Sequence, residues 1–207
     1  MGPENGGRDA NIPGSEIMSQ ILAFAGSTRE DSFNKKLVRV AADRAREAGG
    51  EVTLIDLRDF SMPVYDGDLE ETRGAPENAT KLYEVMKQHQ GLLLSCPEYN
   101  SSITAVLKNT IDWVSRPRDG DAPLAAFTNK VAALLSASPG GLGGLRGLVH
   151  VRAILGNIGV FVLPTQIAVP KASGAFDDNG ALKDAELSKK VQRLAAELVS
   201  TTRKLSG

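Results

Sequence analysis

The regular alternation of short apolar segments with longer amphipathic segments constrains the fold of this chain most. Five apolar segments have the length of strands and are bounded by turn residues, at 21–25, 52–57, 91–96, 131–136 and 160–167. The amphipathic segments predict helices at about 34–48, 76–90, 103–115, 142–158 and 184–204. Such alternation is typical of βαβ units, so we expect an α/β fold with a mostly parallel sheet.

The composition fits one globular domain that follows a short tail. The 207 residues are 42% hydrophobic and 24% charged, within the range of a single soluble domain. Residues 1–19 contain four glycines and two prolines and have no apolar stretch typical of a signal peptide, so we expect a disordered tail there and one domain over residues 20–207. Nowhere does the chain reach the roughly 18 consecutive apolar residues of a membrane-spanning helix. We therefore expect no membrane insertion.

Charge and cysteine content exclude several classes of function. The formal net charge is −1, which leaves no basic excess for a nucleic-acid backbone. Cys96 is the only cysteine, so the chain can form neither an intrachain disulfide nor a Cys-rich zinc site. The two histidines, His89 and His150, belong to no metal-spaced or Ser/His/Asp cluster, and we assign both to structure. We expect a cytoplasmic protein that acts on a small molecule.

Polar side chains follow the first predicted strand. The loop over residues 26–34 reads GSTREDSFN and leads directly into a helix. Its hydroxyl groups, its guanidinium and the amides at the helix N-terminus form a set that binds a phosphate monoester. The alternative is that Ser32 and Asn34 only cap the helix, which leaves Gly26 and Arg29 unexplained. The loop contains neither GxxxxGK[ST] nor G-x-G-x-x-G, so it is not a P-loop or a dinucleotide fingerprint.

The loop after the third strand carries groups suited to a planar ring. Residues 96–102 read CPEYNSS, where Pro97 fixes the chain as it leaves the sheet and Tyr99 supplies an aromatic face. Asn100 and the two serines supply hydrogen-bond donors and acceptors. The alternative is an ordinary strand-to-helix loop, with one of the serines as the helix N-cap and Tyr99 packed on the surface.

Glycines dominate the loop after the fourth strand. Residues 136–144 read SASPGGLGG, and their spacing departs from the dinucleotide fingerprint. Two interpretations stay open: backbone amides exposed to a ring carbonyl, or glycines that ease a tight turn into the next helix. Ligands of open α/β sheets bind at the carboxyl ends of the strands, where all three loops would meet. A phosphate site beside two ring-binding loops matches flavin mononucleotide (FMN).

Three segments of the chain resemble one known family. GSTREDSFN, PEYNSSITAVLKNTIDW and SPGGLGG are similar to motifs of the NADPH-dependent FMN reductase family of flavodoxin-like proteins, which includes quinone and chromate reductases. The likeness runs from about residue 21 to residue 198. It implies a three-layer sandwich with a five-stranded parallel sheet in the order 2-1-3-4-5. It also implies a homodimer or homotetramer, with the helix after PEYN near the partner and Trp113 either at that interface or in the core.

By motif position, the resemblance assigns non-covalent FMN binding to eleven residues. Those expected to hold the phosphate are Ser27, Arg29, Ser32 and Asn34. Those expected to line the isoalloxazine are Pro97, Glu98, Tyr99 and Asn100. Those expected near its pyrimidine side are Ser136, Ser138 and Gly140. This chain has Cys96 where the family commonly has Thr, and we interpret Cys96 as a small buried hydrophobe.

The resemblance also implies a reaction. NADPH or NADH would pass a hydride to N5 of bound FMN and leave, and a quinone, free flavin, chromate or similar acceptor would then take its place, in a ping-pong sequence. No catalytic side chain is expected, because the cofactor carries the chemistry. Two alternatives remain. One is a flavodoxin-type electron carrier, but such carriers are typically strongly acidic, whereas the net charge here is −1. The other is a non-catalytic anion-binding domain.

Two further segments carry charge. The candidate partners of an NADPH phosphate are Arg29, Arg73, Arg116 and Arg118, among which the sequence does not choose. The acidic run over residues 66–71 is expected to be a solvated loop that could also border the site of a neighbouring subunit.

Overall fold

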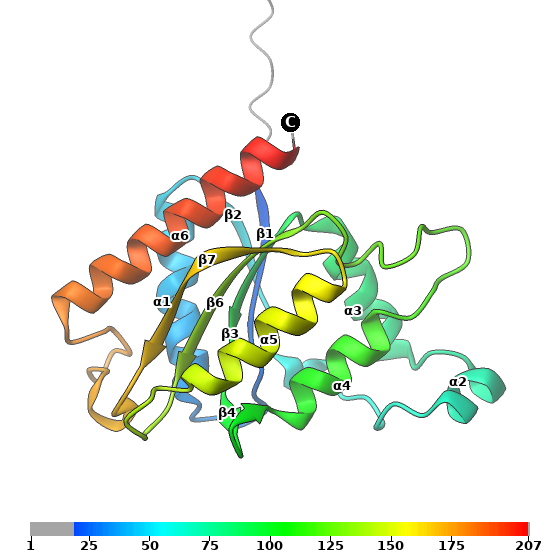
Figure 1. The fold of residues 1–207 in the computed structure, drawn as a ribbon, viewed down its shortest axis with the longest axis horizontal. Helices are drawn as coiled ribbons and strands as arrows, with labels where there is room; N and C mark the ends of the chain where they lie inside the picture. Colours follow the sequence, from blue (N-terminus) through cyan, green and yellow to red (C-terminus); the bar gives the residue numbers. More distant parts are fainter. Residues whose placement is uncertain (1–18, 207) are drawn as a thin grey trace, which may run out of the picture.

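The computed structural model describes residues 19–206 and contains a five-stranded parallel sheet with helices on both faces (Figure 1). The strands of this sheet are β1 (Gln20–Ala25), β2 (Glu51–Leu54), β3 (Gly91–Ser95), β6 (Val131–Ala137) and β7 (Phe161–Val169). They lie in the order β2-β1-β3-β6-β7, and every neighbouring pair is parallel. Counted along the chain, this order is 2-1-3-4-5, so the predicted topology is confirmed.

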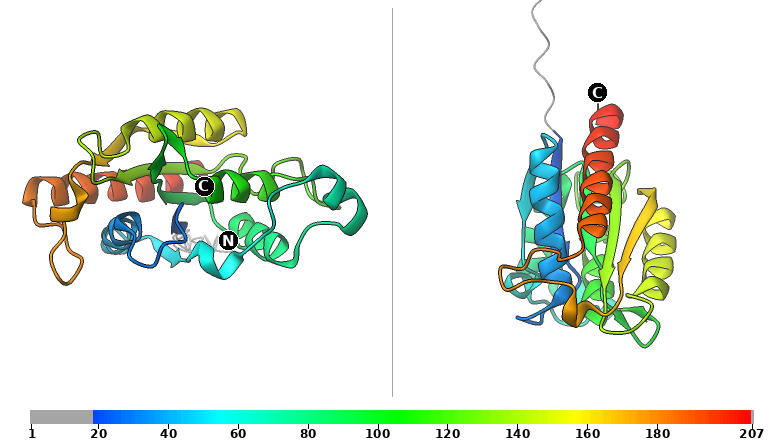
Figure 2. Two further views of the ribbon diagram at one scale, coloured as in Figure 1. Left: turned by 90° about the horizontal axis from the view of Figure 1, so that it is seen from below. Right: turned by 90° about the vertical axis from the view of Figure 1, so that its left-hand side faces the viewer.

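The helices form the two outer layers. On one face of the sheet lie α1 (Phe33–Glu47) and α6 (Ala185–Ser206), and on the other lie α3 (Glu77–Gln88), α4 (Ala105–Val114) and α5 (Leu145–Asn157). Figure 2 shows α5 on the opposite side of the molecule from α1. Alternate residues of each strand enter opposite cores, as Ala23 does with α1 and Leu22 does with α3. The flavodoxin-like three-layer sandwich is confirmed.

Ser19, the first described residue, is held against the rest of the fold. Ser19 is buried, and its Oγ donates to the carbonyl of Val199 in α6, while its own carbonyl accepts from the amide of Glu51. Of the tail expected over residues 1–19, residues 1–18 lie outside the described residues, and Ser19 packs against the fold instead. Within residues 19–206, no helix is both long enough and apolar enough to cross a membrane.

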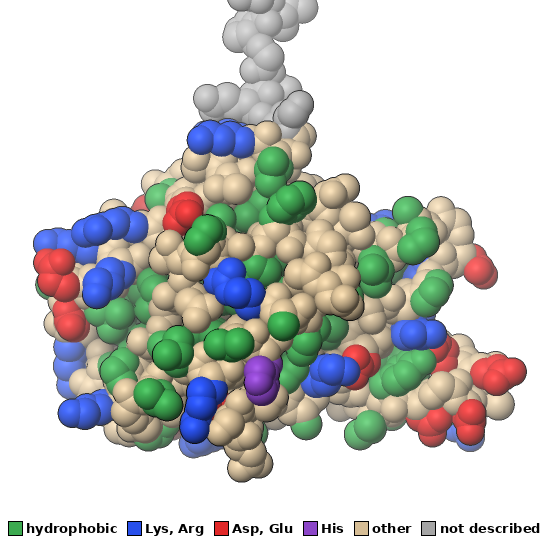
Figure 3. All heavy atoms as spheres, in the orientation of Figure 1, with side chains coloured by type: hydrophobic (Ala, Val, Ile, Leu, Met, Phe, Trp, Pro, Cys, Tyr) green, Lys and Arg blue, Asp and Glu red, His purple; other side chains and the backbone are tan. Residues whose placement is uncertain are grey.

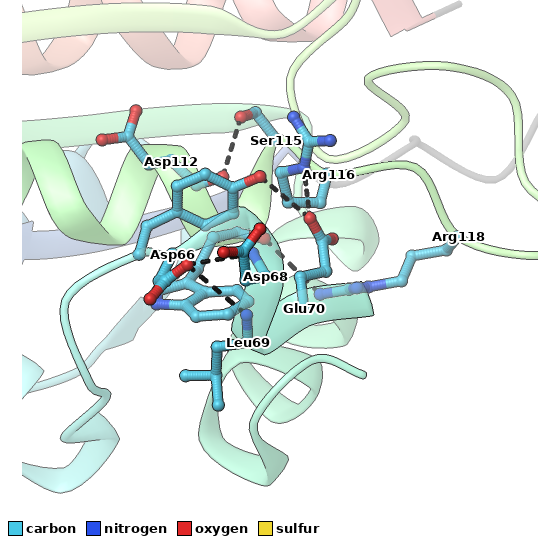
Figure 4. Close-up of polar contacts among 10 residues, drawn as sticks. Asp66, Asp68, Leu69, Glu70, Asp112, Ser115, Arg116 and Arg118 are labelled. Atoms are coloured by element: carbon cyan, nitrogen blue, oxygen red, sulfur yellow. Dashed lines mark hydrogen bonds and ion pairs between the residues drawn. The ribbon is translucent and has the colours of Figure 1, made fainter. Parts of the chain in front are cut away.

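The segment after β2 differs from the prediction. The strand ends at Leu54 instead of residue 57, because the Asp56 carboxylate accepts from the amide of Arg58 and begins a 3-10 helix, η1 (Leu57–Phe60). The acidic run expected to be a loop is mostly helix, α2 (Gly67–Arg73), and the expectation of a loop was wrong. The Asp66 side chain caps it by accepting from two backbone amides (Figure 4).

A two-stranded hairpin, absent from the predicted elements, follows β3. β4 (Glu98–Tyr99) pairs with β5 (Ser102–Ile103), and the two turn residues, Asn100 and Ser101, have φ of 50° and 65°. A two-residue turn with both φ values positive suits the right-handed twist of a hairpin, and Asn tolerates this conformation well. The hairpin lies beside the N-terminal half of α5, below the carboxyl ends of the strands in Figure 1.

The hairpin delays the start of α4. Thr104, not Ser101 or Ser102, is its N-cap, and the Thr104 Oγ1 accepts from the amide of Leu107. The alternative in which one of the two serines caps this helix is therefore wrong.

Trp113 of α4 belongs to the core of its own chain. Its side chain is fully buried, its Nε1 donates to the carbonyl of Pro63 at 2.8 Å, and its ring meets that of Tyr65 edge to face. Glu70 accepts hydrogen bonds from Tyr65 and from Arg116, which holds the segment containing α2 against α4 (Figure 4). The core interpretation of Trp113 is confirmed.

Candidate functional site

The loops that follow β1, β3 and β6 meet in one cleft at the carboxyl edge of the sheet. These strands are neighbours in the sheet, so their ends lie side by side. Of the eleven predicted site residues, the seven that line this cleft are Ser27, Arg29, Ser32, Pro97, Glu98, Tyr99 and Ser138. Phe33, Ala137 and Pro139, which the sequence analysis did not include, complete the lining. We call this space the loop cleft.

One end of the loop cleft is suited to an anion. Ser32 occupies the N-cap position of α1, yet its buried side chain makes no capping bond, and the first turn of α1 holds no acidic residue. The amide of Arg29 donates to Ser27 Oγ, which bends the loop toward the helix. The exposed guanidinium of Arg29 has no ion pair within residues 19–206. The helix amides, the Ser32 hydroxyl and this guanidinium are thus available to a phosphate.

Asn34 fixes the position of this anion site. Its Nδ2 donates to the carbonyl of Ala137 at 2.8 Å, and its Oδ1 accepts from the Ala137 amide and from Ser95 Oγ. The buried amide therefore joins the first turn of α1 to β3 and β6. Because neither the Ser32 side chain nor the Asn34 side chain makes a capping hydrogen bond to α1, the interpretation of both side chains as simple caps is wrong.

Glu98 holds the hairpin against α5. Its side chain is only 8% exposed, and its carboxylate accepts from Nε and Nη2 of Arg146 and from the amides of Arg146 and Gly147. Burial raises the pKa of Glu98, but the hydrogen bonds from Arg146 and Gly147 outweigh it, and the pKa is lowered overall. The carboxylate thereby replaces a side-chain cap at the N-terminus of α5, where the N-cap residue is Gly144.

Tyr99 and Asn100 stand at the tip of the same hairpin. The Tyr99 side chain is 52% exposed and lines the loop cleft, whereas Asn100 lies outside the lining and occupies the turn. His150 of α5 hydrogen-bonds Ser102 Oγ through Nδ1 at 2.8 Å, which adds a second tie between hairpin and helix. Tyr99 therefore lies on a hairpin that hydrogen bonds hold against α5.

The glycine loop after β6 turns tightly. Gly143 and Gly144 both have positive φ, and a Cβ on Gly143 would lie 2.6 Å from the carbonyl carbon of Val169. A Cβ on Gly144 would lie 1.9 Å from Ser136 Oγ. These two glycines are required by the turn into α5, as one of the two interpretations proposed.

The remaining residues of this loop contribute polar atoms. Ser136 is completely buried, and its Oγ has no hydrogen-bond partner in the described part of the chain. Ser138 Oγ accepts from the amide of Gly140, which lies outside the cleft lining. Gly141 has open space around its Cα, so its backbone can be approached closely.

Cys96 is a buried hydrophobe. Its side chain is inaccessible, and burial raises the pKa of the thiol to about 12. The thiol is therefore protonated at neutral pH and out of reach of solutes. Within residues 19–206, no group of three or more His, Cys, Asp or Glu side chains could hold a metal ion.

The topology and the cleft together define a class of protein. A doubly wound sheet in this order, with an anion site after its first strand and an aromatic side chain after its third, is a flavodoxin-like fold with a site for a phosphate joined to a planar ring. A family model described as NADPH-dependent FMN reductase matches residues 19–174. The chain belongs to this family.

Individual relatives and structures agree with this family. The chain is 32% identical over 189 residues to an NAD(P)H-dependent FMN reductase of Pseudomonas aeruginosa, covering 91% of this chain and 97% of that enzyme. It is 30% identical over 197 residues to an NADPH:quinone oxidoreductase of Arabidopsis thaliana, covering 91% and 94%. The structure is similar to that of a flavoenzyme NAD(P)H:(acceptor) oxidoreductase of Paracoccus denitrificans, with a TM-score of 0.77, 25% identity and coverage of 90% and 98%.

The residues present fit the cofactor of this family. FMN has a dianionic phosphate and a planar ring, and the cleft combines a helix N-terminus without a side-chain cap, the Ser32 hydroxyl and the Arg29 guanidinium with the aromatic side chain of Tyr99. The unpartnered Ser136 hydroxyl lies beneath the third loop. The protein is thus an FMN-dependent enzyme with NAD(P)H as its hydride donor.

Proposed function

We propose that this enzyme transfers reducing equivalents from NAD(P)H to a small oxidised acceptor such as a quinone, a free flavin or chromate. The observation that carries the proposal is the loop cleft, where an anion site and an exposed aromatic side chain share one edge of the sheet. The names of relatives, which include quinone reductases of Escherichia coli and plants, support a quinone as the acceptor class.

We assign the FMN phosphate to Ser27, Arg29, Ser32 and the N-terminus of α1. Asn34 acts as a positioning residue, because its amide already bridges α1 to two strands. Glu98 has the same kind of role for the hairpin. The residues assigned to the ring are Pro97, Tyr99, Asn100, Ser136, Ser138 and Gly140.

The side chains of the cleft bind and orient, and none needs to act as an acid, base or nucleophile. When bound, FMN supplies the hydride chemistry between donor and acceptor. The exposed Tyr99 presents its aromatic face at the cleft. Cys96 is buried and protonated, so its sulfur offers no reactive thiolate to the cleft. An exposed ring accepts many partners, so we expect broad acceptor specificity.

Donor and acceptor use the cleft in turn in this proposal. Initial rates measured at several NADPH and quinone concentrations should then give parallel double-reciprocal lines, the pattern of a ping-pong reaction. Intersecting lines would show that both bind together and would overturn this part of the proposal. Steady-state consumption of NAD(P)H with a quinone also separates this enzyme from a flavodoxin-type electron carrier, which would not turn over the nucleotide.

We propose a homodimer or homotetramer in the cytoplasm. Seven large hydrophobic side chains are exposed in the described residues, and the five that lie on the hairpin, on α5 and its preceding loop, or on β7 are Tyr99, Leu142, Leu145, Val149 and Phe161. Figure 3 shows hydrophobic side chains at several places on this face, among polar and charged ones. Large exposed hydrophobic side chains on one face favour contact with a second copy. Light scattering on the purified protein would give the oligomeric state, and a monomer would refute it.

A further inference from the structure

A second cavity lies across the β1 loop from the loop cleft. Its volume is about 480 Å³, and it is bounded by the loop after β1, by η1 with the residues that follow it, and by α4. Ser27 and Arg29 line the loop cleft, whereas Thr28 and Glu30 of the same loop line this cavity. Only the loop after β1 therefore separates this cavity from the loop cleft, so a ligand that occupied both would cross that loop.

The walls of this cavity combine apolar and polar groups. Phe60, Met62 and Val106 supply apolar surface on two sides. The hydroxyl groups of Thr28 and Ser61 are exposed and make no hydrogen bond within the described residues. Small-molecule sites typically have volumes of about 300–1,000 Å³ and a few polar groups among apolar ones. A purine between apolar walls, with its ribose at the hydroxyl groups, matches this lining.

Arg58 supplies a cation at this cavity. Its partner is the carboxylate of Glu30, at 3.7 Å, and the Glu30 side chain is 91% exposed. Such a solvated pair is weak, so the guanidinium remains available to a phosphate. The backbone of Arg58 is held in place because its amide donates to Asp56, whose other oxygen accepts from Lys35 at 2.6 Å.

Of the four arginines considered from the sequence, Arg73 of α2 is exposed and does not line this cavity, and the other three have other contacts or positions. Arg116 donates to Glu70 at 2.9 Å, and Figure 4 marks this contact with a dashed line. Arg118 stacks over the ring of Tyr83 and has a buried Nε. Arg29 lines the loop cleft, where the FMN phosphate is assigned. Arg58, which the sequence analysis did not select, is the arginine that lines the adjoining cavity.

We propose that this cavity binds the adenosine half of NADPH and that Arg58 binds its 2′-phosphate. The inference rests on the proposed function, because it assumes that NADPH places its nicotinamide at the loop cleft. It makes Arg58 a specificity-determining residue for NADPH over NADH. A guanidinium is suited to a phosphate dianion, whereas the two free hydroxyl groups of an NADH ribose would gain little from it.

The first test measures binding without turnover. Adenosine 2′,5′-bisphosphate is titrated calorimetrically into the FMN-loaded protein, its Arg58→Ala variant and a control, Arg39→Ala, which removes another exposed arginine outside this cavity. We expect the dissociation constant to rise about 10- to 100-fold in Arg58→Ala and less than about twofold in Arg39→Ala. Equal affinities in the two variants, or no binding by the unaltered protein, would overturn the inference.

The second test separates this inference from the proposed function. Arg58→Ala should raise KM for NADPH without changing kcat, and should leave KM for NADH within about twofold. If the unaltered protein oxidises NADPH but Arg58→Ala does not change its KM, the inference is wrong and the proposed function stands. If the FMN-loaded protein oxidises neither nucleotide, the proposed function itself is wrong.

Discussion

Replacing Arg29 with Ala should weaken FMN binding selectively. The guanidinium lines the anion end of the loop cleft, is exposed, and has no ion pair within residues 19–206. Its removal therefore breaks no side-chain hydrogen bond or ion pair within the described residues. We expect the free energy of unfolding of the apoprotein to change by less than about 0.5 kcal/mol.

The loss in affinity follows from the contact that Arg29 would make. A hydrogen bond between a guanidinium and a phosphate contributes about 1.5–3 kcal/mol, and a change of about 1.4 kcal/mol is tenfold in a dissociation constant. Arg29→Ala should thus raise the FMN dissociation constant about 10- to 150-fold. The helix N-terminus and Ser32 remain, so binding should weaken without disappearing.

The assay is a titration of FMN fluorescence against apoprotein at fixed ionic strength. Two controls accompany it: Arg39→Ala, which removes an arginine on the exposed side of α1, and Cys96→Ala, which alters a buried side chain beside the cleft without a polar contact. Both should stay within about threefold of the unaltered protein. A dissociation constant for Arg29→Ala no higher than those of the controls would refute the assignment of the anion site.

Three further changes test other parts of the site. Tyr99→Ala should alter FMN affinity or turnover with little effect on stability, because the side chain is half exposed; unchanged kinetics and affinity would remove Tyr99 from the site. Gly143→Ala should lower the free energy of unfolding in urea by about 2–4 kcal/mol, because the residue has a positive φ and the new Cβ would clash with the backbone of Val169. Gly141→Ala, where the space is open, should have little effect. Equal urea midpoints for the two variants would contradict this. The pKa of Glu98 is lower in the folded protein than in the unfolded protein. Its carboxylate therefore stabilises the fold at pH values above the pKa of the unfolded state, and this stabilisation is lost as the pH falls through the pKa of the folded state. Glu98→Gln should therefore lower the free energy of unfolding at pH 7 and lose this effect in acid, and a pH-independent difference would argue against the ion pair.

The main elements of the fold could be predicted because they bury regular apolar patterns. β3 and β6 are buried along their whole length and read as continuous apolar runs, and α6 shows one apolar face. The β4–β5 hairpin could not be predicted, since strands of two residues carry no periodicity and its turn lacks the usual Asn-Gly pair. α2 contains no buried residue, so only the capping carboxylate of Asp66 marked its start.

The sequence located the loop cleft but not the role of each residue in it. Ser27, Arg29 and Tyr99 follow strands whose neighbours could be inferred, and the structure brings them together. Asn34 bonds Ala137, 103 positions away, and Glu98 bonds Arg146, 48 positions away, so both contacts depend on tertiary packing that the sequence does not show. Arg58 was missed for the same reason: only the fold places η1 beside α4.

The most direct test of the account is an absorbance spectrum of the purified protein after it is mixed with FMN and desalted, followed by anaerobic titration with NADPH and with NADH. We expect a retained flavin band that bleaches on addition of the nucleotide, with NADPH effective at the lower concentration. A retained band that neither nucleotide bleaches would indicate an electron carrier, and a colourless protein would contradict the FMN site itself.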